Sequence, residues 1–221
     1  ADARSGAGTG VRVPLRATAP PATGAGRREP PSFPQGLAAH RTPVALKPSI
    51  HRVTIALSDL DRHHYDSTTL TVALHPSETP ERLWARLLAW CLHADPELAF
   101  TKGLSEASEP DLWRLGPDGR PRLWIEVGEP AVDRIRKATR QADEVFVYCF
   151  NHKAPTWWSQ HGDAFGKLPV TVRGFPWPAL QALAARLERT LDLGVTVAEG
   201  TVYLAFPEAQ IEVPVTAPGA A

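Results

Sequence analysis

Two acidic residues in the middle of the chain have the types and the setting of ligands for a divalent metal ion. Asp111 follows Pro110, and Glu126 interrupts an otherwise apolar run over residues 123–127. Metal-dependent cleavage of a phosphodiester needs hard oxygen ligands, a water that the ion activates, and a cation that steadies that water or the developing charge. Asp111 and Glu126 are the candidate ligands.

Both acids also have simpler explanations, which the sequence leaves open. Alternation along a strand turns Glu126 to the face opposite Ile125 and Val127, where solvent exposure would explain it. Asp111, after a proline, has the usual setting of an aspartate that caps a turn or a short helix. The two carboxylates approach each other if they lie on neighbouring antiparallel strands joined by a turn at "GPDGRP".

A strand, a helix and a second strand follow in succession around the second acid. Residues 123–127 and 145–150 are apolar runs, and the second is nearly continuous, as in a strand that is covered on both faces. Gly128 and Pro130 end the first strand and open a helix over 131–142. This succession predicts a parallel crossover unit.

The helix expected over 131–142 carries three basic side chains, Arg134, Arg136 and Lys137. At about 100° per residue, Lys137 lies nearly opposite the apolar stripe of this helix and points towards solvent. Arg134 and Arg136 flank the stripe, so they reach the edge of a sheet more easily. The simpler interpretation of such a basic run is a solvated helix face rather than a contact with phosphate.

The ordered part is expected to begin near Lys47 with a hairpin and a core helix. Two alternating apolar runs, 50–57 and 65–74, are joined by an Asp-rich turn and predict an antiparallel hairpin. A helix-start signature at Ser77 precedes "ERLWARLLAWCLHA". One face of this helix is expected to be buried and another to carry two arginines: the first holds Trp84, Leu87, Leu88 and Cys91, the second Arg82 and Arg86.

Further elements are expected in the C-terminal half of the chain. They are a short helix around Trp157 and Trp158, a strand over 170–172, a helix over 178–191, and strands over 195–197, 202–206 and 211–215. A turn at Glu199-Gly200 joins two of these strands into a hairpin. The adjacent tryptophans could stack on nucleic-acid bases, but one core residue beside one partly exposed residue is the expected arrangement.

The net charge of zero hides an asymmetry between the two parts of the chain. Residues 1–44 carry six arginines against Asp2 and Glu29, a charge of +4, which leaves −4 for the remainder. This mild acidity argues against a general nucleic-acid scaffold with a large positive field, although a local basic strip is compatible with it. Cys91 and Cys149 lack metal-ligand spacing and are expected to be buried, reduced thiols.

The first 43 residues are expected to lie outside the folded domain. They are rich in Gly and Pro and show no helical or strand period, which favours disorder over a transit peptide. Because the chain contains no methionine, Val44 is a candidate start, in which case residues 1–43 would be spurious upstream sequence. The domain is expected over 44–216, with a disordered tail over 217–221. Without a long apolar run or a secretory signal, a cytoplasmic protein without membrane contact is expected.

Six blocks follow one another along the chain: "VALKPSIHRVTIALSDLDRHHYD", "LHPSETPERLWARLLAW", "FTKGLSEASEPDLW", "LWIEVGEPAVDRIRKA", "VYCFN" and "WW". In this order and spacing they resemble the YaeQ family of bacterial proteins, over about residues 44–216. The resemblance implies an α/β fold of the PD-(D/E)xK nuclease-like superfamily. That fold is a restriction-endonuclease-like central mixed β-sheet flanked by helices, here with an N-terminal β-hairpin.

The resemblance also implies roles for individual residues. Asp111 matches the acid after proline, and Glu126 matches the acid of the second half-motif, so together they would hold Mg²⁺ or Mn²⁺ as catalytic residues. The lysine that usually follows two residues later is replaced by Gly128. Glu81 resembles an extra catalytic acid on the first helix, although a first-turn acid that favours the helix dipole is the simpler explanation.

The resemblance implies that a cation from the following helix replaces the missing lysine. Lys137 is the catalytic candidate, and Arg134 and Arg136 are candidate nucleic-acid contacts. The function implied is that of a metal-dependent nuclease-like protein acting on nucleic acid. The alternative is an inactive nuclease-fold protein that binds nucleic acid or a protein partner in transcription, which the mild acidity fits somewhat better than tight DNA binding. The sequence predicts no oligomeric state.

Overall fold

The computed structural model of this 221-residue chain describes residues 47–103, 106 and 108–218. All described residues belong to one compact unit of the chain, which begins after Pro43. The expected disorder of residues 1–43 and the candidate start at Val44 therefore lie outside the described residues. The same holds for residues 219–221 of the expected tail.

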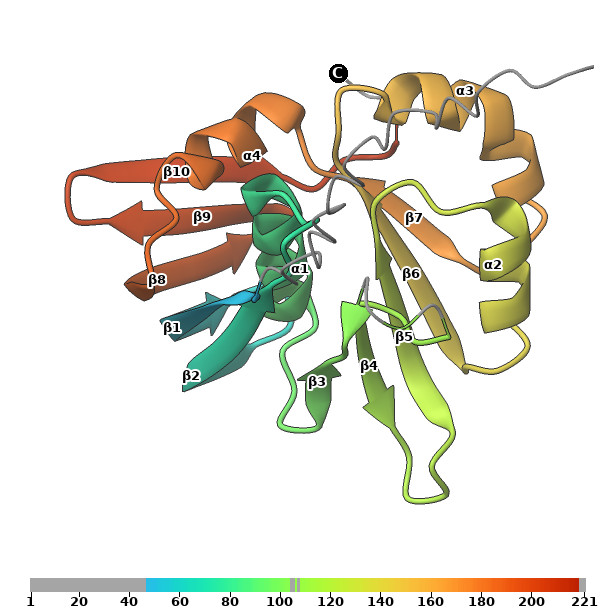
Figure 1. The fold of residues 1–221 in the computed structure, drawn as a ribbon, viewed down its shortest axis with the longest axis horizontal. Coiled ribbons are helices and arrows are strands. Elements are labelled where there is room, and N and C mark those ends of the chain that lie inside the picture. The colour runs from blue at the N-terminus through green and yellow to red at the C-terminus, as the bar shows by residue number, and fades with distance from the viewer. Residues whose placement is uncertain (1–46, 104–105, 107, 219–221) are drawn as a thin grey trace, which may run out of the picture. The chain divides into compact units, whose positions relative to one another are not determined.

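The first of two five-stranded sheets joins the beginning and the end of the described chain (Figure 1). Its strand order is β10 (Ala209–Pro214), β9 (Thr201–Phe206), β8 (Thr190–Ala198), β1 (Ser49–Asp59) and β2 (His64–Leu74). β1 and β2 form the predicted antiparallel hairpin, and β8 runs parallel to β1. The predicted β8–β9 hairpin is confirmed too. Its turn residues Glu199 and Gly200 both have positive φ, 51° and 71°, as favoured two-residue hairpin turns require.

The second sheet is formed by strands that are contiguous in the sequence. Its order is β3 (Leu98–Phe100), β4 (Leu112–Leu115), β5 (Pro121–Val127), β6 (Glu144–Cys149) and β7 (Thr171–Gly174). The pairs β3–β4 and β4–β5 are antiparallel, whereas β5–β6 and β6–β7 are parallel. The predicted crossover from β5 to β6 is confirmed and contains helix α2 (Val132–Ala138).

The expected mixed α/β architecture is confirmed, but the expectation of one central sheet is wrong. The N-terminal hairpin does not join β5 and β6, because β1 pairs with β8 instead. Strand β3, which no sequence pattern indicated, forms the edge of the second sheet beside β4. Two mixed sheets therefore share the domain.

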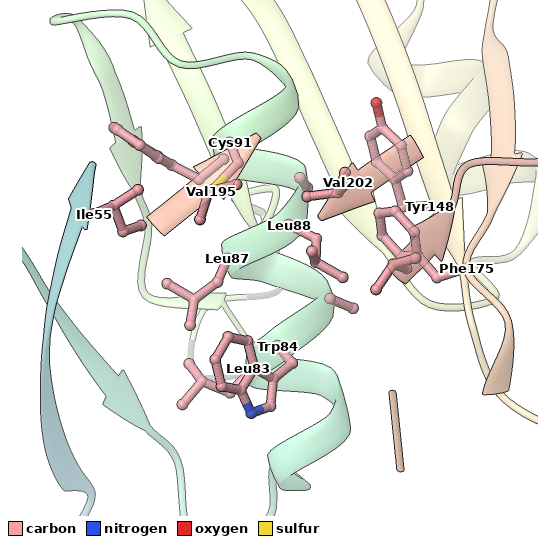
Figure 2. Packing of buried hydrophobic residues seen from close by; sticks show 14 of the residues in the cluster. Ile55, Leu83, Trp84, Leu87, Leu88, Cys91, Tyr148, Phe175, Val195 and Val202 are labelled. Atoms are coloured by element: carbon pink, nitrogen blue, oxygen red, sulfur yellow. The ribbon is translucent and has the colours of Figure 1, made fainter. Parts of the chain in front are cut away.

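Helix α1 (Pro80–Leu92) lies between the two sheets (Figure 1). Figure 2 shows Leu87 and Leu88 of this helix among side chains of both sheets, with Ile55 on one side and Tyr148 on the other. Every residue from 83 to 91 is buried, so the predicted apolar face is confirmed. The expected polar face is not, because Arg86 is buried as well: a helix between two sheets keeps little solvated surface.

The other helices cover the remaining faces. α2 and α3 (Ala154–Phe165) lie against the second sheet on the side away from α1 (Figure 1). Together with that sheet they form a second core, which includes Trp124, Ile135, Val147 and Phe165. α4 (Trp177–Ala184) packs on α1 and β10. Since β5 and β6 are covered on both faces, their apolar runs need no alternation. No helix in the described ranges is long and apolar enough to cross a membrane.

Several helix boundaries differ from the predicted ones. α1 is capped by Thr79, whose Oγ1 accepts a hydrogen bond of 3.3 Å from the Arg82 amide, and not by Ser77. Pro80 at the first helical position fixes this start. α2 ends at Ala138 in a series of tight turns, and α4 ends at Ala184 because the chain enters β8 at Thr190.

Both cysteines are buried free thiols, as predicted. Burial raises the pKa of Cys91 and of Cys149 to about 12 in each case. A thiol is nucleophilic only as the thiolate, so neither cysteine is activated near neutral pH.

Candidate active site at the carboxyl ends of three parallel strands

The parallel strands β5, β6 and β7 end at a common pocket of about 700 Å³. The residues that follow these strands, among them Gly128, Phe150 and Trp177, line this pocket. In open α/β sheets, ligands bind at the carboxyl ends of the strands, because the loops there converge. The topology alone therefore makes this pocket the first place to look for function.

Asp111 enters the pocket from the strand next to β5. It directly precedes β4, and its amide donates to the carbonyl of Ile125 at 3.0 Å, which extends the antiparallel ladder. Its side chain is 1% exposed: Oδ2 accepts from the amide of Val127 at 2.8 Å, and Oδ1 accepts from Arg82 at 2.6 Å. Because Asp111 directly precedes β4, and β4 pairs with β5 in antiparallel register, Asp111 lies beside the end of β5.

Glu126 reaches the same pocket from β5. It is only 6% exposed, so the explanation as a solvated strand residue is wrong. Its Oε1 accepts from Trp124 Nε1 at 2.9 Å and from Arg134 Nε at 2.8 Å. The pKa of Glu126 is raised, mainly because burial disfavours the charged carboxylate; Arg134 opposes this effect, and the charge of Asp111 adds to it.

Arg82 and Arg86 of α1, which the sequence placed on a polar helix face, form ion pairs that fix Asp111 in the pocket. Arg82 contacts Glu78 at 3.0 Å besides Asp111, and Arg86 contacts both oxygens of Glu78, at 3.1 and 3.2 Å. Arg86 Nε also lies 3.7 Å from Asp111 Oδ1. These residues form a buried network, Glu78–Arg82–Arg86–Asp111, of which Arg82 and Asp111 line the pocket.

A signal for this network is present in the sequence. Arg82 and Arg86 are four residues apart in α1, so they lie on the same side of the helix, and Glu78 directly precedes the N-cap Thr79, within reach of both. An arginine in the first turn of a helix opposes the helix dipole, which favours acids there. Such an arginine indicates a nearby carboxylate from elsewhere in the chain, here Asp111.

The basic residues predicted on α2 separate into two groups. Arg134 lines the pocket, where it contacts Glu126 and donates to the carbonyl of Glu109 at 2.7 Å. Arg136 is exposed and paired with Asp133 on its own helix. Lys137 is exposed, as the helical wheel indicated, and it does not line the pocket. Glu81 is half-buried in the first turn of α1 and also lies outside the pocket lining.

The position of the missing lysine has a backbone conformation that disfavours a lysine. Gly128 has a φ of +115°, and its amide donates to the carbonyl of Tyr148 at 2.8 Å where the chain leaves β5. Residues with a Cβ rarely adopt such a φ, so a lysine here would strain the turn. Among the described lysines, Lys153 at the start of α3 is the one that lines the pocket. Lys153 follows β6 and not β5, so the usual spacing of two residues between the acid and the lysine does not predict it.

Glu129, another acid of the pocket, links two loops of the site. Glu129 accepts from the amides of Phe150 and Asn151, at 3.1 and 3.2 Å, and from the Asn151 side chain. These bonds tie the loop after β6 to the loop after β5. They fix Phe150 in the pocket wall next to Trp177.

The donors present fit a magnesium ion that keeps part of its water shell. Among the described residues there is no group of three or more His, Cys, Asp or Glu side chains arranged to hold a metal. Mg²⁺ commonly binds through one or two carboxylates and retains several waters. Asp111 and Glu126 supply two carboxylates. Each Asp111 oxygen accepts one of the hydrogen bonds described above and keeps a second acceptor site, whereas Oε1 of Glu126 already accepts two, so Glu126 would bind the ion through Oε2.

Comparison with known proteins supplies the family. The sequence model of the family described as "YaeQ protein" matches residues 44–215. The chain is 39% identical to the uncharacterised protein YaeQ of Escherichia coli (strain K12) over 182 residues, which cover 79% of this chain and 97% of that protein. The uncharacterised protein YaeQ of Salmonella typhi is 38% identical over 180 residues, with the same coverage of both chains.

Two solved structures are similar in fold. The YaeQ protein from Xanthomonas axonopodis pv. citri matches with a TM-score of 0.74 and 37% identity, over 77% of this chain and 99% of that one. The YaeQ protein from Pseudomonas syringae matches with a TM-score of 0.73 and 34% identity, over 76% of this chain and 94% of that one. Sequence and fold agree, and the chain belongs to the YaeQ family.

Proposed function

We propose that the pocket is the active centre of a metal-dependent, nuclease-like enzyme that hydrolyses phosphodiester bonds of nucleic acid, and that the second sheet with its flanking helices is the restriction-endonuclease-like part of the fold. The observation that carries this proposal is the meeting of Asp111 and Glu126. They come from neighbouring antiparallel strands and line one pocket at the carboxyl edge of the parallel strands. A purely structural pair of acids would not need to face a cavity of this size.

In this proposal Asp111 and Glu126 hold Mg²⁺ or Mn²⁺. The bound ion supplies polarisation of a phosphate oxygen and a water of lowered pKa. The hydrogen bonds from Val127 and Trp124 fix the two carboxylates in direction. Arg134 then has two roles, because it holds Glu126 in place and presents positive charge to an anionic substrate.

The cation of the reaction is better assigned to the pocket wall than to the outer face of α2. Arg134 and Lys153 line the pocket, whereas Arg136 and Lys137 do not. Glu81 is likewise replaced by Glu78 as the helix acid that matters to the site, since Glu78 orients Arg82 and Arg86. Glu78 acts by positioning these arginines and need not touch substrate.

The test is a calorimetric titration with Mg²⁺ and with Mn²⁺. The native protein and a Glu81→Gln control are expected to bind the ion, while Asp111→Asn and Glu126→Gln are expected to lose most of the binding. The control removes a carboxylate of the same kind outside the pocket. Unchanged binding in the two pocket variants, or no binding by the native protein, would refute the metal site.

A second candidate function is favoured by one observation, the pairing of both acids with arginine. Arg82 and Arg134 already neutralise Asp111 and Glu126, so the pocket can be stable without an ion. In that case it would bind nucleic acid, or a protein partner, without catalysis. Binding of a short oligonucleotide in the presence of EDTA, weakened by salt and indifferent to added Mg²⁺, would favour this function over the first.

A further inference from the structure

Besides its charged residues, the pocket has an aromatic wall formed by Phe150, His152 and Trp177. The ring of Trp177 lies 6.4 Å from that of Phe150, with an angle of 29° between the planes. The His152 ring lies 6.0 Å from Trp177 at an angle of 57°. The three rings therefore support one another at the edge where β6 and β7 end.

Trp177 is the larger of the two rings in this wall that a ligand can cover, the other being the exposed ring of His152. Phe150 is buried at 6% exposure, whereas Trp177 is half-buried and faces the pocket as the first residue of α4. Pro176 directly before it and the helix that follows limit the movement of its backbone. A rigid, partly exposed indole in a pocket is a prepared surface for a flat apolar ligand.

The other tryptophans, all of which lie in the described part of the chain, do not line this pocket. Trp84, Trp90 and Trp124 are buried, and Trp113 on β4 is half-buried. Trp157 and Trp158, the pair in which base stacking was considered from the sequence, are both half-buried and pack on Phe165 in the second core. The stacking candidate is therefore a tryptophan that the sequence did not single out.

The same pocket presents cations for a phosphate. Arg82, Arg134 and Lys153 line it together with the aromatic wall, and its volume of about 700 Å³ lies within the range of ligand sites, roughly 300 to 1,000 Å³. A nucleotide unit combines a flat base with an anionic phosphate. The base matches the aromatic wall and the phosphate matches these cations, although Arg82 and Arg134 are also paired with Asp111 and Glu126 and the lining includes three further acids, Glu106, Glu109 and Glu129.

We infer that Trp177, supported by Phe150 and His152, is a stacking subsite for a nucleobase of single-stranded nucleic acid. The inference rests on the proposed function and adds the class of substrate. A base inside a duplex is already stacked and paired, so it reaches a side chain only after it has been unpaired. Single strands and frayed ends offer free bases, on which sequence-tolerant aromatic stacking is the usual mode of binding.

The test compares two strands of equal length and phosphate count, one with bases and one fully abasic, by fluorescence anisotropy in EDTA so that neither is cleaved. The native protein is expected to bind the strand with bases at least about fivefold more tightly. Trp177→Leu is expected to lose this preference and to bind both strands like the native protein binds the abasic one. Trp157→Leu removes a half-buried indole outside the pocket and is expected to keep the preference.

Trp177→Phe provides a second variant that retains a stacking ring, and it is expected to keep most of the preference even if Trp177→Leu is poorly folded. Equal affinity of the native protein for both strands, or binding of neither strand, would overturn the inference. So would an unchanged preference in Trp177→Leu.

Calorimetric metal binding separates the two proposals. If the protein binds an ion through Asp111 but shows no preference for the strand with bases, only the stacking subsite is refuted. If it prefers the strand with bases but binds no metal, only the metal site is refuted.

Discussion

The two ends of α1 each hold a buried carboxylate against an arginine, yet they differ in what surrounds the pair. At the C-terminal end, Asp59 is 1% exposed and contacts Arg62 at 2.6 Å. Arg62 also donates to the carbonyl of Cys91, in the last turn of the helix, and to that of Ala94, just beyond the helix. At the N-terminal end, the network of Glu78, Arg82, Arg86 and Asp111 adjoins the pocket.

The two ion pairs differ in whether their side chains face the pocket. The donors of Arg62 are directed at backbone carbonyls, and neither Asp59 nor Arg62 lines the large pocket. Asp111 and Arg82 keep a side towards that pocket. A buried ion pair is weak evidence of stabilisation and no evidence of function by itself. Access to a cavity is what separates the pair that we propose to be functional from the structural one.

The largest effect is expected for Glu78→Ala at the N-terminal end. The substitution leaves Arg82 and Arg86 buried with one carboxylate between them, which is expected to lower the free energy of unfolding by about 3 to 5 kcal/mol. Urea unfolding followed by circular dichroism measures this loss. A loss below about 1 kcal/mol would mean that the network does not hold α1 against the pocket.

A pH effect is expected at the C-terminal end. Burial, with the positive charges of Arg62 and Arg114, lowers the pKa of His93 from its ordinary value of 6.5 to about 4. The unfolded chain then takes up a proton near pH 6.5 that the folded chain refuses until about pH 4. The contribution of His93 to the free energy of unfolding is therefore fully present above pH 6.5. It is lost as the pH drops towards 4, and the total loss is about 3 kcal/mol.

His93→Gln tests this origin. The Gln side chain can retain a hydrogen bond to Tyr148, which in the native protein joins His93 Nε2 and the Tyr148 hydroxyl at 2.7 Å. The difference between the stability curves of the two proteins, from urea unfolding at a series of pH values, is expected to open between pH 6.5 and 4. Parallel curves would assign the acid sensitivity to other groups.

A smaller effect is expected for Asp59→Ala. Arg62 is 37% exposed and can turn towards water once its partner is gone, so a loss of about 2 kcal/mol is expected, below that for Glu78→Ala. The folded variant should bind metal and oligonucleotide like the native protein. Calorimetry at a temperature where the variant is folded provides the measurement. Lost ligand binding would place both ends of α1 in one functional unit and remove the contrast between them.

Local patterns predicted local structure well. The β1–β2 and β8–β9 hairpins and the β5–α2–β6 crossover follow from alternation, turn residues and apolar runs, all of which lie within a few residues of one another. The pairing of β1 with β8 could not be predicted in this way, because residues more than a hundred positions apart decide it. The split into two sheets was missed for that reason.

The site was predicted in part for the same physical reason. Asp111 and Glu126 were found because they stand out in apolar or proline-bearing surroundings, and the structure places both in one pocket. Arg82 and Arg86 were read as solvated, since their burial depends on Asp111 from a distant segment. Lys153 and Trp177 line the pocket only because three parallel strands end together, which no spacing along the chain reveals.

The pairing of β1 with β8 also has a consequence for synthesis of the protein on the ribosome. The second sheet is complete once residue 174 has emerged, but the first sheet waits for β8, which starts at Thr190. Until then the first sheet supplies α1 with the β1–β2 hairpin alone, and the apolar side chains that α1 turns towards that sheet lack part of their cover. Nascent chains that stall in this interval would carry every strand of the pocket and still depend on chaperones to stay soluble.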